Sequence, residues 1–584
     1  MVVNEQKKRI AILGAGPSGL FFYKHLVESK RSDWDVSLFD RSSQLGAGMP
    51  YGSAGANREH VTNVSANEIP PLVTSLTEWI QQQPAEVLEP FQLEATQVSD
   101  YRVVPRILFG QYLAAQFDLL REQAACQGLI THVHLNSQIL DIVDDPETNQ
   151  VWVETDTMGK MPFDVAIICT GHQWPTKHEG KIPLYFSSPY PPAKLKLTLN
   201  HAVAIRGASL TAIDAIRTLA RHNGHFDTGP DGRLRFQLSP QSPDFRLVMH
   251  SREGLLPAIR FHLEEPLISA EDLLSPDLVA DNRAQNDGFL SLDFVFDQAF
   301  KRAIRRKAPV FYERIKAMSL EEFVETMMSQ REKEDAFQLF AAEYKQAEES
   351  IKKHESIYWK EMLAVLSFAL NYPAKYFSAE DMERLKKVLM PLISLVIAFV
   401  PQSSARELLA LHQAGLLTIQ SVGQDSEVIP QPSGGAIYEY TDEDGQSHRV
   451  YYPAFVDCIG QPHLDFDDFP FTSLRIDKTV SPARLRYQSN QEGQAAREQG
   501  NDDVEQLSDG NYYLRVPGVA INDDFQLVNE EGQGNPRLYM MAVPHMGGYN
   551  PDYSGLDFCE TASARISQRL FSDNPTAAGL LLQF

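Results

Sequence analysis

The chain opens with a hydrophobic pattern that predicts a βαβ unit. Residues 9–13 form a short apolar run that ends at glycine, which is typical of a buried parallel strand. Residues 18–30 space their apolar positions as a helix does, and a second apolar run at 36–39 ends at Asp40. Strand, turn, helix and strand within about thirty residues have the size of one βαβ unit.

The same order of elements returns in the middle of the chain. Residues 202–206 predict a strand, 210–221 a helix and 246–250 the next strand. The polar link at 222–245 is rich in Gly, Pro and Asp, which favours an inserted loop. Residues 163–169 predict another buried strand.

The second half of the chain begins with a long region of helical pattern. Residues 290–415 are charged, glycine-poor and helix-patterned, and strands return at 416–460. The polar segment 485–510 predicts a mobile loop. A strand at 538–543 and a helix at 556–571 close the pattern.

The first βαβ unit carries a GxGxxG turn. The first glycine permits the tight turn, the second lets a pyrophosphate approach the backbone, and the third lets helix and strand pack closely. The free N–H groups and the dipole of the helix N-terminus also attract phosphate. Asp40 follows at the distance expected of an acid that binds a ribose hydroxyl, so we interpret this as a dinucleotide site rather than a structural glycine turn. The turn is formed by Gly14, Ala15, Gly16, Pro17, Ser18 and Gly19.

The segments after Asp40 favour FAD over NAD as the ligand of this site. A second glycine-rich loop lies at 44–52, and a further polar segment at 60–67. An FAD domain needs such segments to cover the flavin, which extends past the first βαβ unit, whereas an NAD domain does not. The alternative is that these are ordinary surface loops.

These motifs together resemble the bacterial FAD-NAD(P)-binding family of YdhS-like proteins, which is related to flavoproteins with two dinucleotide-binding domains, such as the N-hydroxylating flavin monooxygenases. The resemblance spans most of the chain outside the helical insertion. It is carried by residues 14–19 (GAGPSG), 46–52 (GAGMPYG), 104–112 (VPRILFGQY), 169–172 (CTGH), 207–214 (GASLTAID) and 251–257 (SREGLLP).

The resemblance implies how FAD is held. An arginine placed like Arg106 contacts FAD in related flavoproteins, although the alternative is a surface salt bridge. The segment Thr170-Gly171 closes over the cofactor, or it simply ends a strand. The expected FAD contacts are Gly14, Gly16, Pro17, Ser18, Gly19, Asp40, Arg41, Gly48, Asn63, Arg106, Thr170, Gly171 and Gly555.

The second βαβ unit resembles the family's NAD(P) loop, with one departure. Serine stands at position 209, where the second glycine is expected, and its Cβ would crowd a pyrophosphate. Arginine suits a 2′-phosphate, and Arg252 follows the next strand, which favours NADPH over NADH. The alternative for Arg252 is an exposed loop residue. The expected contacts are Gly207, Ser209, Leu210, Thr211, Ser251 and Arg252.

The loop before the last helix supplies weak candidates for catalysis. His545 or Asp552 could touch substrate, although a lone histidine is more often structural. In flavoproteins of this architecture the last helix points its N-terminus at the flavin, where the dipole stabilises the anionic reduced ring.

The resulting fold class is α/β, with two Rossmann-like dinucleotide-binding domains, for FAD and NAD(P), and a large helical insertion. We expect the first part of the FAD domain at 1–200 and the NAD(P)-binding-like domain at 201–289. The helical insertion follows at 290–415. Residues 416–584 return to the nucleotide domain and complete the FAD domain.

Composition disfavours nucleic acid and membranes as partners, and the expected partner is a small-molecule substrate. The formal net charge of −24 on 584 residues disfavours nucleic acid and anionic membranes. The most apolar stretch, 389–401, is too short to span a bilayer and predicts a buried helix. Four scattered cysteines form no CxxC pair, so we expect neither a redox dithiol nor a zinc site. Such sparse cysteines are typical of a reducing compartment, and we therefore expect a cytoplasmic location.

Three functions fit these patterns. The leading one is an FAD-dependent, NAD(P)H-using monooxygenase that acts on a small molecule, although a Phe-x-Gly-x-x-x-His run, the Baeyer–Villiger fingerprint, is absent. The second is a reductase or dehydrogenase with an acceptor other than oxygen. The third is a non-catalytic FAD-binding sensor or partner protein. Ser209 and the helical insertion favour this third function.

Overall fold

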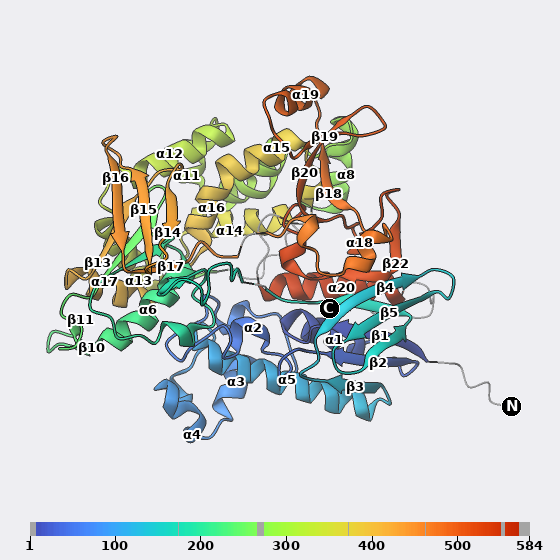
Figure 1. Cartoon of the computed structure of the whole chain (residues 1–584), viewed down its shortest axis with the longest axis horizontal. Helices are drawn as coiled ribbons and strands as arrows, with labels where there is room; N and C mark the ends of the chain where they lie inside the picture. The colour runs from blue at the N-terminus through green and yellow to red at the C-terminus, as the bar shows by residue number, and fades with distance from the viewer. Residues whose placement is uncertain are drawn as a thin grey trace.

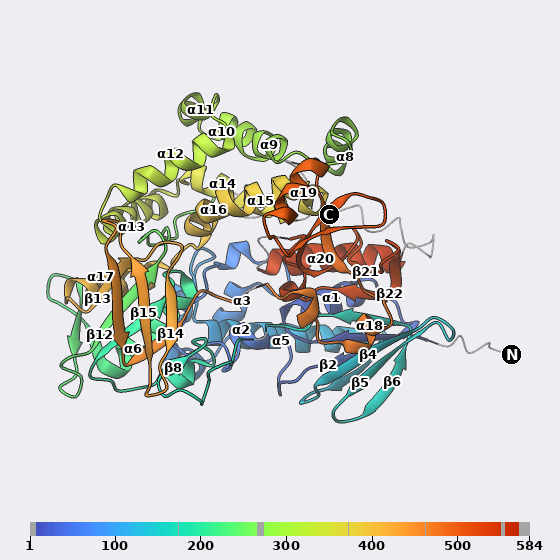
Figure 2. The ribbon, with the colours of Figure 1, turned by 45° about the horizontal axis from the view of Figure 1, so that its top comes forward.

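The computed structural model describes residues 7–172, 174–264, 274–371, 373–461, 463–550 and 555–571. Within them the chain forms two parallel sheets, each flanked by helices, and a layer of helices above both (Figures 1 and 2). This is the α/β fold with two Rossmann-like units and a helical insertion that the sequence predicts.

The first sheet contains strands from both ends of the chain. Its core is parallel, with β1 between β2 and β7, and β22 extends it beside β7. Counted along the chain, the parallel strands have the spatial order 3-2-1-4-5, which follows the strand order of the Rossmann fold. In spatial order the strands are β21 (Gln526–Val528), β22 (Gly534–Met540), β7 (Val165–Ile168), β1 (Lys8–Leu13), β2 (Trp34–Phe39) and β3 (Ile130–His134).

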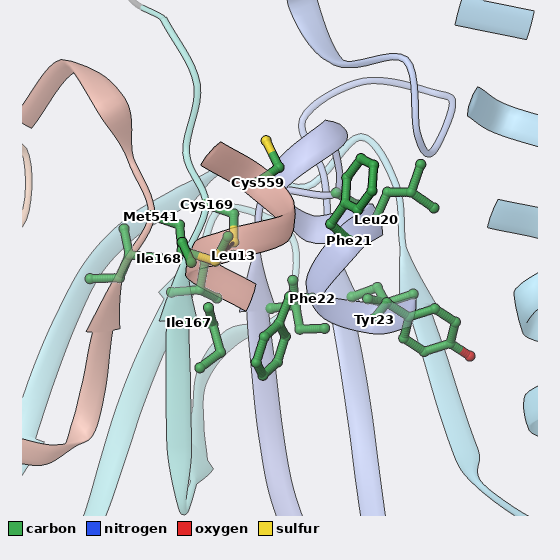
Figure 3. Packing of buried hydrophobic residues seen from close by; sticks show 14 of the residues in the cluster. Leu13, Leu20, Phe21, Phe22, Tyr23, Ile167, Ile168, Cys169, Met541 and Cys559 are labelled. Carbon is green, nitrogen blue, oxygen red and sulfur yellow. Dashed lines mark hydrogen bonds between the residues drawn. The ribbon is translucent and has the colours of Figure 1, made fainter. Parts of the chain in front are cut away.

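Helices from opposite ends of the chain bury this sheet. Side chains of α1 (Pro17–Glu28), such as Phe21 and Phe22, are fully buried, and α20 (Leu556–Phe571) packs beside them. Figure 3 shows Cys559 of α20 close to Cys169 and Met541 at the ends of their strands. Helix α5 (Arg106–Cys126) packs against α1. The predicted helix at 556–571 is thus confirmed.

The second sheet repeats the first. Strand β9 lies between β12 and β17, all parallel, and β13 joins beside β12. Helices α6 (Leu210–Asn223) and α17 (Gln402–Gln413) pack against one another. In spatial order the strands are β13 (Leu417–Ser421), β12 (Arg246–Ser251), β9 (Ala202–Arg206), β17 (Ala454–Asp457) and β8 (Tyr185–Phe186).

Each parallel sheet is interrupted by a three-stranded antiparallel meander before its fourth strand. One meander contains β4 (Ile139–Asp145), β5 (Gln150–Thr155) and β6 (Gly159–Phe163), and the other β14 (Glu427–Pro430), β15 (Ala436–Thr441) and β16 (Ser447–Tyr452). The two halves of the molecule therefore share one chain order of elements, although their sequences show no repeat.

The helices of the insertion form the upper layer in Figure 2. The apolar stretch 389–401 contains a helix whose Leu392, Ile393 and Val396 are buried, as predicted. The helices are α8 (Pro276–Gln285), α9 (Leu292–Val295), η5 (Phe296–Lys301), α10 (Arg302–Lys307), α11 (Pro309–Ile315), α12 (Leu320–Glu332), α13 (Ala336–Lys353), α14 (Tyr358–Asn371), α15 (Ala379–Arg384), η7 (Leu385–Leu389) and α16 (Met390–Ile397).

Two segments predicted as loops contain regular structure. The link at 222–245 contains the hairpin β10 (Gly224–Thr228) and β11 (Leu234–Leu238). The segment 485–510 contains α19 (Asn490–Glu498) and contributes to a further three-stranded sheet, because its few apolar residues, such as Val504, pack against the helical layer. That sheet consists of β18 (Pro482–Arg486), β20 (Tyr512–Val519) and β19 (Val504–Gln506). The remaining short α-helices are α2 (Gly48–Tyr51), α3 (Leu76–Gln81), α4 (Ala85–Leu88) and α18 (Thr472–Ile476).

Candidate functional site

The first glycine turn lies where β1 enters α1. Gly14 has φ +106°, and a Cβ there would lie 2.5 Å from the carbonyl oxygen of Cys169 at the end of β7. Its N–H donates to the carbonyl of Phe39, 2.9 Å away at the end of β2. Only glycine fits this position, because both the conformation and the space exclude a side chain.

The helix N-terminus above this turn has the features of an anion site. Gly16 caps α1 without a side-chain hydrogen bond, and the first turn contains no acidic residue. A Cβ on Gly16 would lie 3.2 Å from Cα of Gly48, and one on Gly19 would lie 2.3 Å from the carbonyl oxygen of Gly14. The N–H groups of the first turn therefore face a narrow cradle with no side chain in it, which suits a pyrophosphate.

Asp40 lies directly over the turn. Its Oδ2 accepts a hydrogen bond from the N–H of Ala15 at 2.9 Å, and its Oδ1 one from the N–H of Ser42 at 2.8 Å. The adjacent Arg41 is exposed and donates from Nη2 to the carbonyl of His172 at 3.4 Å. The carboxylate is held at the edge of the cradle, where a ribose would follow the pyrophosphate.

The second glycine turn, between β9 and α6, has the same construction. Gly207 has φ +105°, and a Cβ there would lie 2.8 Å from the carbonyl oxygen of Cys458 at the end of β17. Its N–H donates to the carbonyl of His250 at 2.8 Å, as that of Gly14 does to Phe39. Cys169 and Cys458 also correspond, because each donates its N–H at 2.8 Å to the residue before the glycine.

The two cradles differ at the second glycine. Ser209 caps α6 with an extended backbone (φ −90°) and no side-chain cap bond, so its backbone does not require glycine. Leu210 and Thr211 begin the helix, and its first turn contains no acidic residue. The N-terminus of α6 therefore forms the same kind of cradle as that of α1, and the one difference at this position is the hydroxymethyl group of Ser209.

Ser251 and Arg252 occupy the place that Asp40 and Arg41 hold in the first sheet, after the second strand. The side chain of Arg252 is 57% exposed, and its nearest acid is Glu253, with Nε and Oε1 4.0 Å apart. An exposed guanidinium without a close ion pair is available to a phosphate group.

The two sheets meet at the ends of their corresponding fourth strands. His172 follows β7 and Gln461 follows β17, and Nδ1 of His172 lies 2.5 Å from Oε1 of Gln461. Thr170 and Gly171 lie between β7 and this contact, and a Cβ on Gly171 would meet no atom of the described residues within 4 Å. The open space beside Gly171 agrees with a ligand passing over it.

Arg106 forms a buried ion pair with the second sheet's helix. Its Nη2 lies 2.7 Å from Oδ2 of Asp214 in α6, and its Nε donates to the carbonyl of Val61 at 3.2 Å. The hydroxyl of Tyr190 donates to the same Oδ2 of Asp214 at 2.8 Å. Burial alone would raise the pKa of Asp214, but the charge of Arg106 lowers it, so the carboxylate is ionised. The structure thus places Arg106 in a largely buried salt bridge, with its side chain 16% exposed, and its expected contact with FAD stays a prediction.

A polar contact continues along the same helix. The ring of His60 is fully buried, with Nε2 3.0 Å from Oγ1 of Thr218 and 3.2 Å from the carbonyl of Asp214. Glu59 accepts a hydrogen bond from Thr218 at 2.7 Å. Burial lowers the pKa of His60, so its ring is neutral at pH 7. The backbone carbonyl oxygen of Asn63 accepts a hydrogen bond from Arg260, and the expected contact of Asn63 with the cofactor stays a prediction.

The segment before α20 holds the remaining predicted residues. His545 is 3% exposed, its Nδ1 has no partner within the described residues, and burial lowers its pKa to about 4. It packs edge-to-face on Phe469, as a structural residue does. Gly555 is exposed, with φ +116°, and Asp552 lies outside the described residues.

Sequence reasoning missed two groups in the first turn of α20. Asp557 lies there, and its burial, with Glu560 nearby, raises its pKa to about 7. Cys559 contacts Oγ of Ser18 through Sγ at 3.4 Å, so α20 reaches the first cradle. Asp557 stands out only because it is a buried acid in an amphipathic helix. Burial cannot be read from the sequence alone, so the sequence carries no signal for it.

Family models match two separate parts of the chain. Residues 11–173 match the FAD-NAD(P)-binding family, and residues 275–397 match the YdhS-like middle domain. The uncharacterized protein YdhS of Escherichia coli (strain K12) is 27% identical over 473 residues, which cover 80% of this chain and 86% of that protein. The chain is a homologue of YdhS. Its N-terminal part is an FAD-NAD(P)-binding domain, and the helical layer contains a YdhS-like middle domain.

Solved structures resemble the whole chain at low sequence identity. The ornithine N-hydroxylase of Kutzneria sp. 744 is 13% identical, with a TM-score of 0.45 over 97% of this chain and 100% of that one. The L-lysine 6-monooxygenase of Pseudomonas syringae is 12% identical, with a TM-score of 0.48 over 98% and 100% of the two chains.

The described residues contain neither a metal-binding cluster nor a helix able to cross a membrane. No group of three or more His, Cys, Asp or Glu side chains in that part of the chain is arranged to hold a metal ion. Within the same ranges, no helix has the length and apolarity that crossing a membrane requires.

Proposed function

We propose that this protein is an FAD-dependent oxidoreductase that takes its electrons from NADPH and acts on a small molecule as a monooxygenase. The observation that carries the proposal is the pair of matching cradles. Gly14 against Cys169 and Gly207 against Cys458 form the same turn under an uncapped helix N-terminus. One cradle lies in the FAD-NAD(P)-binding domain, and the other would take the second dinucleotide.

FAD, when bound, supplies the redox chemistry by accepting electrons from the nicotinamide and passing them on. The chain's own residues would bind and orient the two nucleotides. The N–H groups of the first turn of α1 would bind the FAD pyrophosphate, and Asp40 a ribose hydroxyl. Ser209 and the N-terminus of α6 would bind the NADPH pyrophosphate, and Arg252 its 2′-phosphate.

The cysteines argue for an external electron acceptor. Cys169 and Cys559, near the first cradle, are both buried, and burial raises the pKa of Cys559 to about 12 and also holds the pKa of Cys169 well above its usual range. Thiols held in the protonated form are poor nucleophiles and poor partners in thiol–disulfide exchange. Electrons therefore leave to oxygen or to a small molecule rather than through a dithiol of the chain.

Monooxygenation is the reaction we favour. The solved structures similar to this chain include enzymes named for hydroxylating ornithine and lysine, so amines are the first substrates to try. The alternative, a reductase with an acceptor other than oxygen, would use the same two cradles and is separated from monooxygenation by the acceptor alone.

The test is an anaerobic titration of the purified yellow protein with NADPH, and separately with NADH, followed at the flavin band. We expect NADPH to bleach the band and NADH to do so more slowly. Air is then admitted with and without ornithine or lysine, and hydrogen peroxide and hydroxylated product are measured. Bleaching that reoxidises only with an added non-oxygen acceptor would favour the reductase, and no bleaching with either nucleotide would overturn the proposal.

A further inference from the structure

A cavity of about 640 Å³ lies away from both glycine turns, where three parts of the molecule meet. The segment between α2 and α5 forms one wall, α6 and the start of α17 form another, and residues 260–263 with the end of α13 form a third. None of the lining residues belongs to the cradles at 14–19 and 207–211, and neither Ser251 nor Arg252 takes part. We call this space the junction cavity.

The junction cavity is lined by cationic side chains in a strongly acidic protein. Five arginines and two histidines line it against two glutamates, whereas the chain as a whole has a net charge of −24. Arg217 and Arg221 are held by Glu407 at 2.8 to 3.0 Å, and Arg260 is held by Glu68. These three are structural and leave other groups to receive a ligand.

Arg102 also has a partner within the protein, so the groups that remain are two histidines and Arg58. His262 is 8% exposed, yet its ring nitrogens make no hydrogen bond within the described ranges. Its ring centroid lies 5.1 Å from that of His354 on the same wall and 5.2 Å from that of Tyr101 on another wall. Arg58, exposed at the rim, has no ion pair or hydrogen bond with any described residue.

The start of α17 adds donors to the same wall. Gln402 and Ser403 line the junction cavity, and Pro401 caps the helix without a side-chain bond or an acid in the first turn. The Nε2 atom of Gln402 is buried and has no hydrogen-bond partner in the described part of the chain. Buried N–H donors normally have acceptors, so a ligand oxygen would complete this wall.

The rest of the lining is apolar. Phe91, Leu93, Phe261, Leu263 and Ile351 face the junction cavity beside the donors. A volume of this size lies within the range of small-molecule sites, which combine apolar walls with a few placed polar groups. Imidazole N–H, amide N–H and guanidinium are donors to oxyanions, whereas a cation would find few acceptors here.

We propose that the junction cavity binds a small organic anion, a carboxylate or phosphate ester with an apolar body. The oxyanion lies between His262, His354 and Gln402, with Arg58 at the rim, and the apolar body lies against Phe91 and Leu263. This site is separate from both dinucleotide cradles, and the proposal does not depend on the redox function.

The experiment uses the FAD-loaded full chain and phenyl phosphate as the probe, followed by isothermal titration calorimetry. Benzoate and inorganic phosphate are titrated separately, and phenol serves as the uncharged control. We expect one saturable site for phenyl phosphate, competition by benzoate and phosphate, and no binding of phenol. Tighter binding of benzoate than of phenyl phosphate would assign the oxyanion as a carboxylate, and the reverse order as a phosphate.

Variants at the rim locate the site. Arg58→Gln removes an exposed charge without a partner, and His354→Asn keeps a residue that tolerates the left-handed backbone there (φ 55°). We expect each to weaken phenyl phosphate binding at least fivefold. Arg233→Gln, an exposed arginine on the β10–β11 turn, should leave it unchanged.

Two results would overturn the proposal. One is an affinity that is the same in Arg58→Gln, His354→Asn and the unaltered protein. The other is full competition between phenyl phosphate and NADPH together with loss of binding in Arg252→Gln, since the anion would then occupy the nucleotide cradle. A failure of NADPH to reduce the flavin concerns the proposed function alone and leaves this test intact.

Discussion

The guanidinium of Arg106 and the carboxylate of Asp214 join the two dinucleotide-binding halves of the molecule through a buried contact of 2.7 Å. Arg106 begins α5, which packs on the first sheet, and Asp214 lies in α6, directly after the second glycine turn. Tyr190 donates to the same carboxylate. The pair therefore fixes the second cradle relative to the first.

Removing one partner of this pair is predicted to destabilise the protein by about 3 kcal/mol, because it leaves a buried charge without compensation. Asp214→Asn and Arg106→Met each remove one charge, and the double variant removes both. Urea unfolding of the four proteins forms a double-mutant cycle. We expect the double variant to be more stable than the two single effects added together.

Asp118 and Arg121 form the matched control. They are also an ion pair of the first half, at 3.1 Å, but their side chains are 66% and 42% exposed. Exposed pairs contribute little, so Arg121→Gln should change the free energy of unfolding by less than about 0.5 kcal/mol. If the effects of Arg106→Met and Asp214→Asn on the free energy of unfolding simply add in the double variant, the two side chains are not energetically coupled and the prediction is contradicted.

Local features of the molecule could be predicted from the sequence, whereas contacts between distant segments could not. The turn at Gly14 depends on residues that are adjacent in the chain, so its strand, turn and helix were readable. The identity of Asp214 as the partner of Arg106 depends on how two domains pack, and no local pattern contains that information. The correspondence of Cys169 with Cys458 likewise appears only when the two sheets are compared.

The segments predicted wrongly are polar ones whose order comes from tertiary contacts. Residues 485–510 are polar enough to suggest a mobile loop, yet Val504 and Tyr487 pack on the helices of the insertion. The hairpin within 222–245 is held by Phe226 against Phe236, with ring centroids 4.8 Å apart. One apolar pair is too weak a sequence signal to outweigh the glycines and prolines around it.

Gly207→Ala is predicted to abolish NADPH binding while FAD stays bound. The new Cβ would lie 2.8 Å from the carbonyl oxygen of Cys458, and φ is +105°, so both space and conformation oppose it. Flavin content is measured by absorbance and NADPH binding by the rate of anaerobic flavin reduction.

Gly232→Ala provides the control for backbone strain. Gly232 also has a positive φ, +75°, but a Cβ there meets no atom of the described residues within 4 Å. This variant should cost roughly 1 kcal/mol of stability and leave flavin reduction unchanged. Normal reduction in Gly207→Ala would show that the second turn does not hold the nucleotide.

Arg252→Gln is predicted to weaken NADPH binding at least tenfold and to leave NADH binding unchanged. The exposed guanidinium has only Glu253 near it, at 4.0 Å, so its loss removes a phosphate partner without breaking the fold. The dependence of flavin reduction rate on each nucleotide's concentration provides both affinities. Arg233→Gln is the matched exposed arginine, and an equal loss for NADH and NADPH in Arg252→Gln would assign the residue to another role.

Asp557→Asn is predicted to stabilise the protein above pH 7 and to have little effect below pH 4. Burial and the nearby Glu560 raise the pKa of Asp557 to about 7, from an ordinary value of 3.8 in the unfolded chain. Between these two values the folded state binds the proton more tightly, so the contribution of Asp557 to stability falls as pH rises from about 4 to 7. Asparagine cannot ionise and removes this loss. A pKa difference of about 3 units corresponds to about 4 kcal/mol, so we expect a gain of up to about 4 kcal/mol at pH 8, measured by urea unfolding of the variant and the unaltered protein at pH 4, 6 and 8. A gain that is equal at all three pH values would mean that Asp557 ionises normally in the folded protein.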